Sequence, residues 1–166
     1  MKIFDILQNT VFDGCNVECY SLWIKKRVLV YEYGPQMQGK IKLSLEAEQE
    51  EGALIYNSTD CGLSACGYPH FDAMFIYRHK DQREFSVSLV LTREKITKQD
   101  IENFIHSLEQ CKEKISLPHI RWKAVIATEI QISPEEKSKL LAAFSRVYTG
   151  KYSDYIGRNI EAFIKT

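Results

Sequence analysis

The sequence has no excess of either charge, no long hydrophobic run and no export signal. Its 22 basic and 22 acidic residues give a formal net charge of +0. Because a protein that binds nucleic-acid backbones through charge alone carries a clear basic excess, we expect any nucleic-acid contact to be local. No stretch approaches the roughly 20 apolar residues of a membrane span, and Lys2, Asp5 and Gln8 interrupt the apolar residues at the start of the chain. These absences predict an intracellular protein, cytoplasmic or nuclear, that has no membrane partner.

The chain also lacks internal repeats, low-complexity segments and an even number of cysteines. Its five cysteines cannot all pair within one chain, and without an export signal we expect their thiols to stay reduced. The 166 residues, of which 45% are hydrophobic, suffice for one hydrophobic core but leave little for a second. We therefore expect residues 1–166 to form a single domain.

The second half of the sequence carries the clearest helix signals. Apolar residues recur at three- and four-residue steps after Thr97, which has an acidic residue three positions later, and this pattern predicts a capped helix that ends before Pro118. A Ser-x-x-Glu box with proline at the first helical position begins at Ser133 and predicts a second helix that runs to Gly150. Helical spacing in the tail predicts a short terminal helix from Ser153.

Runs of β-branched and aromatic residues predict strands between and before these helices. Residues 71–77 and 85–92 flank a short polar segment, which is typical of an antiparallel hairpin. Residues 120–128 lie between the first two helical patterns and predict a mostly buried strand. Upstream, alternation over 41–45 and a short apolar run over 52–57 predict two more strands, the first of them an edge.

The segment 17–33 fits two structures. Its apolar residues fit one face of a helix, and the part from Arg27 to Tyr33 fits a strand equally well. We favour a helix that ends near Gly34 and Pro35. Together, these elements predict an α/β or α+β domain with a mixed sheet of four or five strands flanked by three or four helices.

Two carboxylates on the predicted hairpin form a candidate metal site. Asp72 lies at the start of the first strand, and Glu84 lies at the start of the second. Carboxylates on adjacent strands can converge on a hard cation such as Mg²⁺, which keeps several waters for use as nucleophiles. The alternative is that Asp72 borders a strand and Glu84 is a solvated hairpin residue, and spacing alone does not decide between the two.

Leu54 to Ile130 contains an apolar run, a loop that ends in Tyr-Pro-His-Phe-Asp72, a hairpin, a helix and a strand with Trp122. This stretch resembles the degenerate PD-(D/E)XK nuclease-like domains of Crinkler and retrotransposon-hot-spot proteins. The resemblance implies a restriction-endonuclease-like core, with Asp72 as the central metal ligand. It also implies a glutamate on a helix before the sheet, for which Glu32 is the nearest match. A catalytically active chain would then be a Mg²⁺-dependent phosphodiester hydrolase.

The second hairpin strand departs from the pattern of that family. It reads Glu84-Phe-Ser86-Val-Ser88, so no lysine follows two residues after the glutamate. Ser88 stands near the position where the family has a glutamine or glutamate. Lys95, just beyond the strand, is the candidate for the missing water-orienting base, although a lysine beside a glutamate is more often simply solvated. The sequence therefore leaves open whether catalysis survives.

A second candidate site consists of sulfur and imidazole ligands. Cys15 and Cys19 are four residues apart, Cys61 and Cys66 are five apart, and His70 follows. These residue types can form a tetrahedral Zn²⁺ site. Neither pair is Cys-x-x-Cys, and reduced cysteines are also common as small buried hydrophobic residues. Zinc is therefore the second metal that the sequence allows.

Aromatic and basic residues alternate near the end of the chain. Tyr148, Tyr152 and Tyr155 lie close in sequence to Arg146 and Lys151. Such residues can stack bases and hold phosphates, and they are also enriched in protein-binding surfaces. Two functions follow as hypotheses. The first is a nuclease-like domain, active or degenerate, that acts on or near nucleic acid; the second is a non-enzymatic protein-interaction module, such as an effector or assembly subunit.

Overall fold

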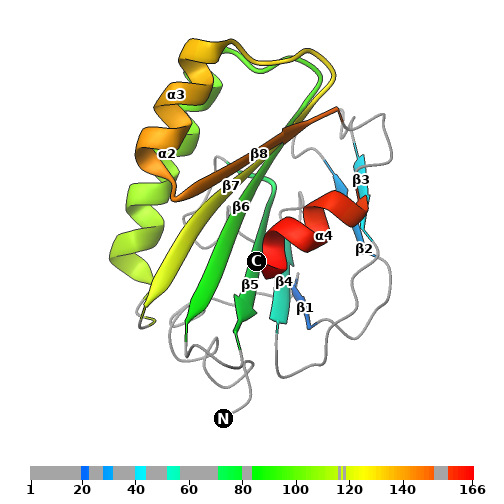
Figure 1. The fold of residues 1–166 in the computed structure, drawn as a ribbon, viewed down its shortest axis with the longest axis vertical. Coiled ribbons are helices and arrows are strands. Elements are labelled where there is room, and N and C mark those ends of the chain that lie inside the picture. Colours follow the sequence, from blue (N-terminus) through cyan, green and yellow to red (C-terminus); the bar gives the residue numbers. More distant parts are fainter. Residues whose placement is uncertain are drawn as a thin grey trace.

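The computed structural model describes residues 20–22, 28–31, 40–43, 52–56, 71–79, 84–115, 117, 119–151 and 157–166. These residues form an α/β fold in which a mixed sheet separates two helices from a third (Figure 1). The strands are β1 (Tyr20–Leu22), β2 (Val28–Tyr31), β3 (Lys40–Leu43), β4 (Gly52–Tyr56), β5 (Ala73–Arg78), β6 (Phe85–Arg93), β7 (Ile120–Thr128) and β8 (Arg146–Gly150). The described helices are α2 (Lys98–Lys114), α3 (Pro134–Ala143) and α4 (Gly157–Lys165).

The main sheet combines an antiparallel half with a parallel half. Its strand order is β1-β4-β5-β6-β7-β8, so six of the eight described strands belong to this sheet, for which the sequence predicted four or five. The pairs β1–β4, β4–β5 and β5–β6 are antiparallel, and the pairs β6–β7 and β7–β8 are parallel. Strands β2 and β3 form a separate two-stranded sheet. The predicted hairpin is confirmed, with Ala73 opposite Val90 and Arg78 opposite Phe85.

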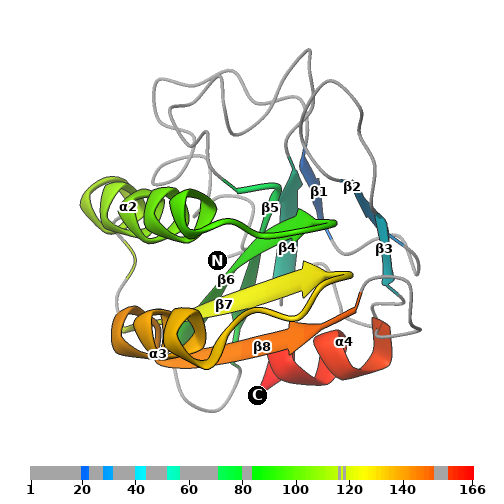
Figure 2. The ribbon, with the colours of Figure 1, turned by 90° about the horizontal axis from the view of Figure 1, so that it is seen from above.

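The parallel strands are joined by helices, because parallel neighbours need a crossover connection. Helix α2 connects β6 to β7, and α3 connects β7 to β8. Both helices lie over the same face of the sheet (Figure 2). Each begins at the predicted capping box, in which the side chain of Thr97 accepts a hydrogen bond from the Asp100 backbone N–H and that of Ser133 accepts one from Glu136.

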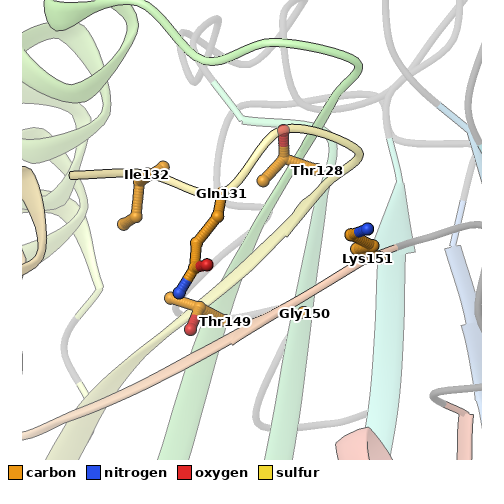
Figure 3. Close-up of a pocket in the computed structure, with 6 residues that line it drawn as sticks. All are labelled: Thr128, Gln131, Ile132, Thr149, Gly150 and Lys151. Atoms are coloured by element: carbon orange, nitrogen blue, oxygen red, sulfur yellow. The ribbon is translucent and has the colours of Figure 1, made fainter.

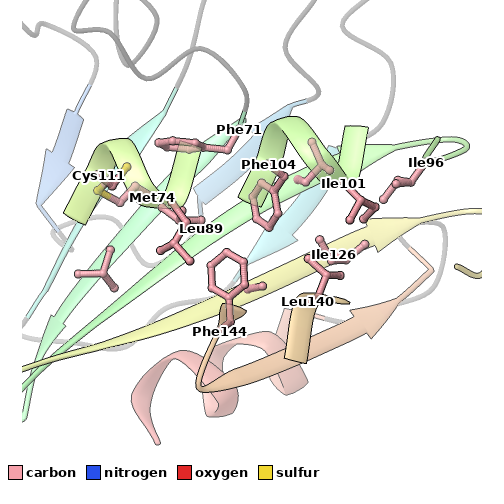
Figure 4. Close-up of a cluster of buried hydrophobic side chains, with 14 of the residues drawn as sticks. Phe71, Met74, Leu89, Ile96, Ile101, Phe104, Cys111, Ile126, Leu140 and Phe144 are labelled. Carbon is pink, nitrogen blue, oxygen red and sulfur yellow. The ribbon is translucent and has the colours of Figure 1, made fainter. Parts of the chain in front are cut away.

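The main hydrophobic core lies between the sheet and these two helices. Phe104 of α2 stacks on Phe144 at the end of α3, with 5.4 Å between the ring centroids (Figure 4). Alternate residues of the central strands enter this core, among them Leu89 of β6 and Ile126 of β7. The periodicity that predicted the first helix is confirmed, since its apolar stripe is buried: Ile101, Phe104, Leu108 and Cys111.

The opposite face of the sheet is covered by α4, which contacts β3, β5 and β6. Ile160, Phe163 and Ile164 of this helix are buried, as their helical spacing predicted. The sheet residues on this face include polar ones, among them Ser86, Ser88 and Thr92 of β6 and Lys123 of β7, all fully buried. None of the described helices is long and apolar enough to cross a membrane.

Two sequence predictions of secondary structure are wrong. The helix predicted over 17–33 is replaced, where the structure describes it, by strands β1 and β2. The helix that begins at Ser133 ends at Ala143 and does not reach Gly150. Phe144 has extended backbone angles, and the next residues form β8, which pairs with β7. The backbone hydrogen bonds with β7 outweigh the helical spacing of these apolar residues.

Candidate functional site

Asp72 lies directly before β5 and is anchored to the end of β6. Its backbone N–H donates to the carbonyl oxygen of Val90 at 2.8 Å. Its carboxylate oxygen Oδ2 accepts a hydrogen bond from the Thr92 N–H at 2.7 Å. The same oxygen lies 2.8 Å from Nη1 of Arg93. Asp72 therefore connects the beginning of β5 to the last two residues of β6.

The surroundings of Asp72 are those of a buried ion pair. The Asp72 side chain is 0% exposed and that of Arg93 is 22% exposed. Arg93 Nη1 also donates to the carbonyl oxygen of Thr92 at 2.7 Å, so one guanidinium holds both the carboxylate and the adjacent peptide group. Such charge-assisted bonds are stronger than neutral ones, and they offset part of the cost of burying the carboxylate. The hydroxyl of Thr92 is buried without a hydrogen-bond partner in the described structure.

Glu84 lies at the other end of the hairpin. Its carbonyl oxygen accepts the N–H of His79, and its carboxylate is 3.3 Å from Nε of Arg121. Because Asp72 precedes β5 and Glu84 precedes the antiparallel β6, the whole length of β5 separates them. Six residues at about 3.3 Å each amount to roughly 20 Å. The structure does not bring Asp72 and Glu84 together, and one Mg²⁺ ion with oxygen ligands at about 2.1 Å cannot bridge that distance.

Two of the other residues predicted from the nuclease resemblance, Lys95 and Ser88, are described by the structure. Lys95 is exposed, in the turn after β6. Ser88 is buried near the middle of β6, and its hydroxyl has no hydrogen-bond partner in the described structure. Glu32 lies outside the described residues.

The predicted zinc ligands fall in the part of the chain that the structure does not describe. Cys15, Cys19, Cys61, Cys66 and His70 are all outside the described ranges, so their arrangement stays a prediction. Among the described residues, no group of three or more histidine, cysteine, aspartate or glutamate side chains is positioned to hold a metal ion. The cysteine that the structure describes, Cys111, is buried in the core.

A polar cluster that the sequence did not reveal lies at the end of the hairpin near Glu84. Nε2 of His79 and the hydroxyl of Ser86 share a hydrogen bond of 2.7 Å. Burial lowers the pKa of His79 below its usual value, and the positive charges of Arg121 and Lys123 act in the same direction. A neutral imidazole is therefore favoured in the folded state.

Lys123 is the second feature that sequence reasoning missed. It lies in β7 with no exposed surface, and its ammonium donates to the backbone carbonyl oxygens of Phe163 at 2.9 Å and Ile164 at 3.3 Å. Burial lowers its pKa to about 8, with further lowering by Arg146 and Arg121. A cation that binds the last carbonyl groups of α4 also complements the negative end of the helix dipole. A lysine between Trp122 and the apolar run Ala124–Ala127 is the only signal of this role in the sequence.

A small pocket opens at the C-terminal ends of β7 and β8 (Figure 3). Its volume is about 110 Å³, and its lining residues are Thr128, Gln131, Ile132, Thr149, Gly150 and Lys151. In Figure 3 the side chain of Gln131 extends toward Thr149. The pocket is smaller than typical small-molecule sites, which span roughly 300 to 1,000 Å³.

No family model, no curated protein and no solved structure matches this chain.

Proposed function

We propose that this chain is a nuclease-like domain of the restriction-endonuclease superfamily whose catalytic centre is degenerate, and that it works by binding another protein. The order of the elements supports the first half of the proposal. An antiparallel meander, β4-β5-β6, is followed by α2 and the parallel strand β7. Asp72 stands at the start of the second meander strand, the position of the central metal ligand in the resemblance described above.

One observation carries the proposal of degeneracy. The carboxylate of Asp72 is fully buried and bound to Arg93 and to the Thr92 N–H. A metal ion at Oδ2 of this carboxylate would have to displace the guanidinium of Arg93, and breaking this ion pair is costly because the carboxylate is fully buried and the cation largely so. Glu84, the second acid of the predicted site, is instead close to Arg121 at the far end of β5. Asp72 thus serves the fold as a structural anion.

The charge of the chain favours a protein partner over nucleic acid. With 22 basic and 22 acidic residues, it has no net attraction for a phosphate backbone. Two large hydrophobic side chains, those of Ile130 and Leu141, are each 52% exposed. Apolar surface of this kind contributes to protein interfaces, where it is removed from water on binding.

A metal-dependent thermal shift tests the proposal. We expect Mg²⁺ and Mn²⁺ to leave the melting temperature of the wild type unchanged, because an ion stabilises a protein only when it binds the folded state. Incubation of the purified chain with plasmid DNA and with RNA in the presence of either ion should leave both substrates intact. Glu84→Gln serves as the matched control for Asp72→Asn, since both substitutions remove one carboxylate charge.

Metal-dependent cleavage of nucleic acid is the result that would contradict the proposal. Cleavage by the wild type that requires Mg²⁺, disappears in Asp72→Asn and persists in Glu84→Gln would overturn the proposal and assign a metal to Asp72. Both variants are to be compared at a temperature at which circular dichroism shows each to be folded. Loss of activity through unfolding is thereby separated from loss of a metal ligand.

A further inference from the structure

Among the residues that the structure describes, strand β8 has an open backbone edge. It is the last strand of the main sheet, and in the described structure its ladder is formed with β7 alone (Figure 2). Residues Val147 to Gly150 are partly exposed. Because successive residues of a strand direct their N–H and C=O groups to opposite sides, the outer edge presents unpaired donors and acceptors. Such an edge can accept one more extended segment.

The pocket described above lies at the C-terminal end of this edge strand. Thr149 and Gly150 of β8 contribute to its lining, together with Ile132 in the segment between β7 and α3. Its volume of about 110 Å³ suits one side chain better than a separate small molecule. Ile130, exposed by 52%, belongs to the same segment after β7. A strand paired with β8 would thus find an apolar anchor point at one end.

An exposed basic residue flanks β8 at each end. Arg146 begins the strand and Lys151 follows it, and both are exposed. The guanidinium of Arg146 lies over the ring of Phe163, 5.0 Å from its centroid, and donates to the hydroxyl of Thr166. In the described structure neither cation pairs with an acid. Acidic side chains at both ends of a docked segment would complement these charges.

The same charges disfavour a second copy of this chain as the occupant. If two β8 strands paired antiparallel about Tyr148, Arg146 of each copy would lie beside Gly150 and Lys151 of the other. Like charges placed across a strand pair are destabilising. The edge therefore fits a different protein better than itself.

We infer that the outer edge of β8 binds an extended segment of a partner protein that carries an aliphatic side chain for the pocket and acidic residues at both ends. This inference rests on the proposed function, because it names the partner chemistry and the surface of the binding module. The backbone of the segment supplies hydrogen bonds to β8, and its acidic ends select it over neutral strands.

The first test uses synthetic peptides and amide resonances. The probe is a labelled ten-residue peptide of alternating valine and threonine with two glutamates at each end, and the control carries lysines in place of the glutamates. Titration of the ¹⁵N-labelled chain, up to about 1 mM of peptide, should shift amide resonances of β8 and of the pocket residues Thr128 and Gln131. The lysine peptide should bind at least about tenfold more weakly.

Variants of the edge complete the test. Arg146→Glu combined with Lys151→Glu should reverse the preference between the two peptides. Neighbouring residues of β8 direct their N–H groups to opposite sides. Only one of the two substitutions Tyr148→Pro and Thr149→Pro therefore removes an outward donor and leaves the ladder with β7 intact. That variant should stay folded and lose peptide binding.

Three outcomes would overturn the inference. They are equal binding of the two peptides, resonance shifts remote from β8, and a wild-type dimer that the folded proline variant converts to a monomer. None of these bears on whether the domain hydrolyses nucleic acid, which the metal experiment above decides separately. Failure of this inference is therefore distinguishable from failure of the proposed function.

Discussion

At the scale of single residues, the ion pair of Asp72 predicts that Asp72 contributes more to stability than Glu84, although the two carboxylates look equivalent in the sequence. Asp72→Asn leaves Arg93 without its anion in a largely buried place, so we expect the free energy of unfolding to fall by about 2 to 4 kcal/mol. Glu84→Gln removes a half-exposed carboxylate near Arg121, and the loss should stay below about 1 kcal/mol. Urea denaturation of both variants measures the difference. Equal losses would contradict a structural role for Asp72.

Lys123 predicts a dependence of stability on pH. Its pKa is about 8 in the folded protein, against an ordinary value of 10.5. Between these two pH values the unfolded chain holds more protons than the folded one, so the contribution of Lys123 to stability rises as the pH rises from about 8 to about 10.5. Below pH 8 both states carry the charge, and this contribution is at its lowest and constant.

Lys123→Met isolates this effect, because methionine fills a similar volume and does not titrate. We expect the urea midpoint of the wild type to rise relative to that of the variant between pH 8 and pH 10. Other groups titrate in both proteins and cancel in the difference. A constant difference across the range would show that Lys123 keeps an ordinary pKa.

At the scale of elements, the sequence predicted those helices and strands that are specified by short local patterns. The starts of α2 and α3 follow from capping boxes, and the β5–β6 hairpin and β7 follow from β-branched runs. Strand β8 was missed because Val147 and Tyr148 also fit a helical face, and only pairing with β7 makes them a strand. The same ambiguity produced the wrong helix over 17–33. Pairing between distant segments is not encoded in the local pattern.

The candidate site shows the same limit. The sequence placed Asp72 correctly at the start of a strand, but its partner, Arg93, follows 21 residues later. The register that joins them, Ala73 opposite Val90, could not be derived without knowing where the hairpin turns. That register also separates Asp72 from Glu84. Pairing in this register therefore gives Asp72 a buried ion pair with Arg93 at one end of the hairpin and leaves Glu84 at the other.

The capping box of α3 predicts a measurable contribution from one hydroxyl. Ser133→Ala removes the acceptor of the Glu136 N–H and should lower the free energy of unfolding by about 1 kcal/mol. Ser133→Asp retains an acceptor at this position and should leave stability within about 0.5 kcal/mol of the wild type. Thermal denaturation of the two variants provides the comparison. If Ser133→Ala were as stable as the wild type, the cap would contribute nothing.

At the scale of the whole molecule, the two faces of the sheet differ in character. One face packs against α2 and α3 through a continuous hydrophobic core. The other face lies under α4 and buries Ser88, Thr92 and Lys123, of which the first two have hydroxyl groups without a hydrogen-bond partner in the described structure. Buried polar groups weaken packing relative to apolar ones. We therefore expect α4 to separate from the sheet more readily than α2 or α3.

Hydrogen exchange tests this order of stability. Strands β6 and β7 are buried from both faces along most of their length, so their amides should exchange slowest, by global unfolding. Amides of α4 and β8 should exchange faster, through openings that leave the β6–β7 pair intact. Loss of the Lys123 charge removes the cost of burying it. Raising the pH from 8 to 10 should therefore reduce the difference in exchange protection between α4 and β7, after correction for the chemical exchange rates. If α4 exchanges as slowly as β7 at both pH values, the two faces unfold together and the polar face contributes as much as the core.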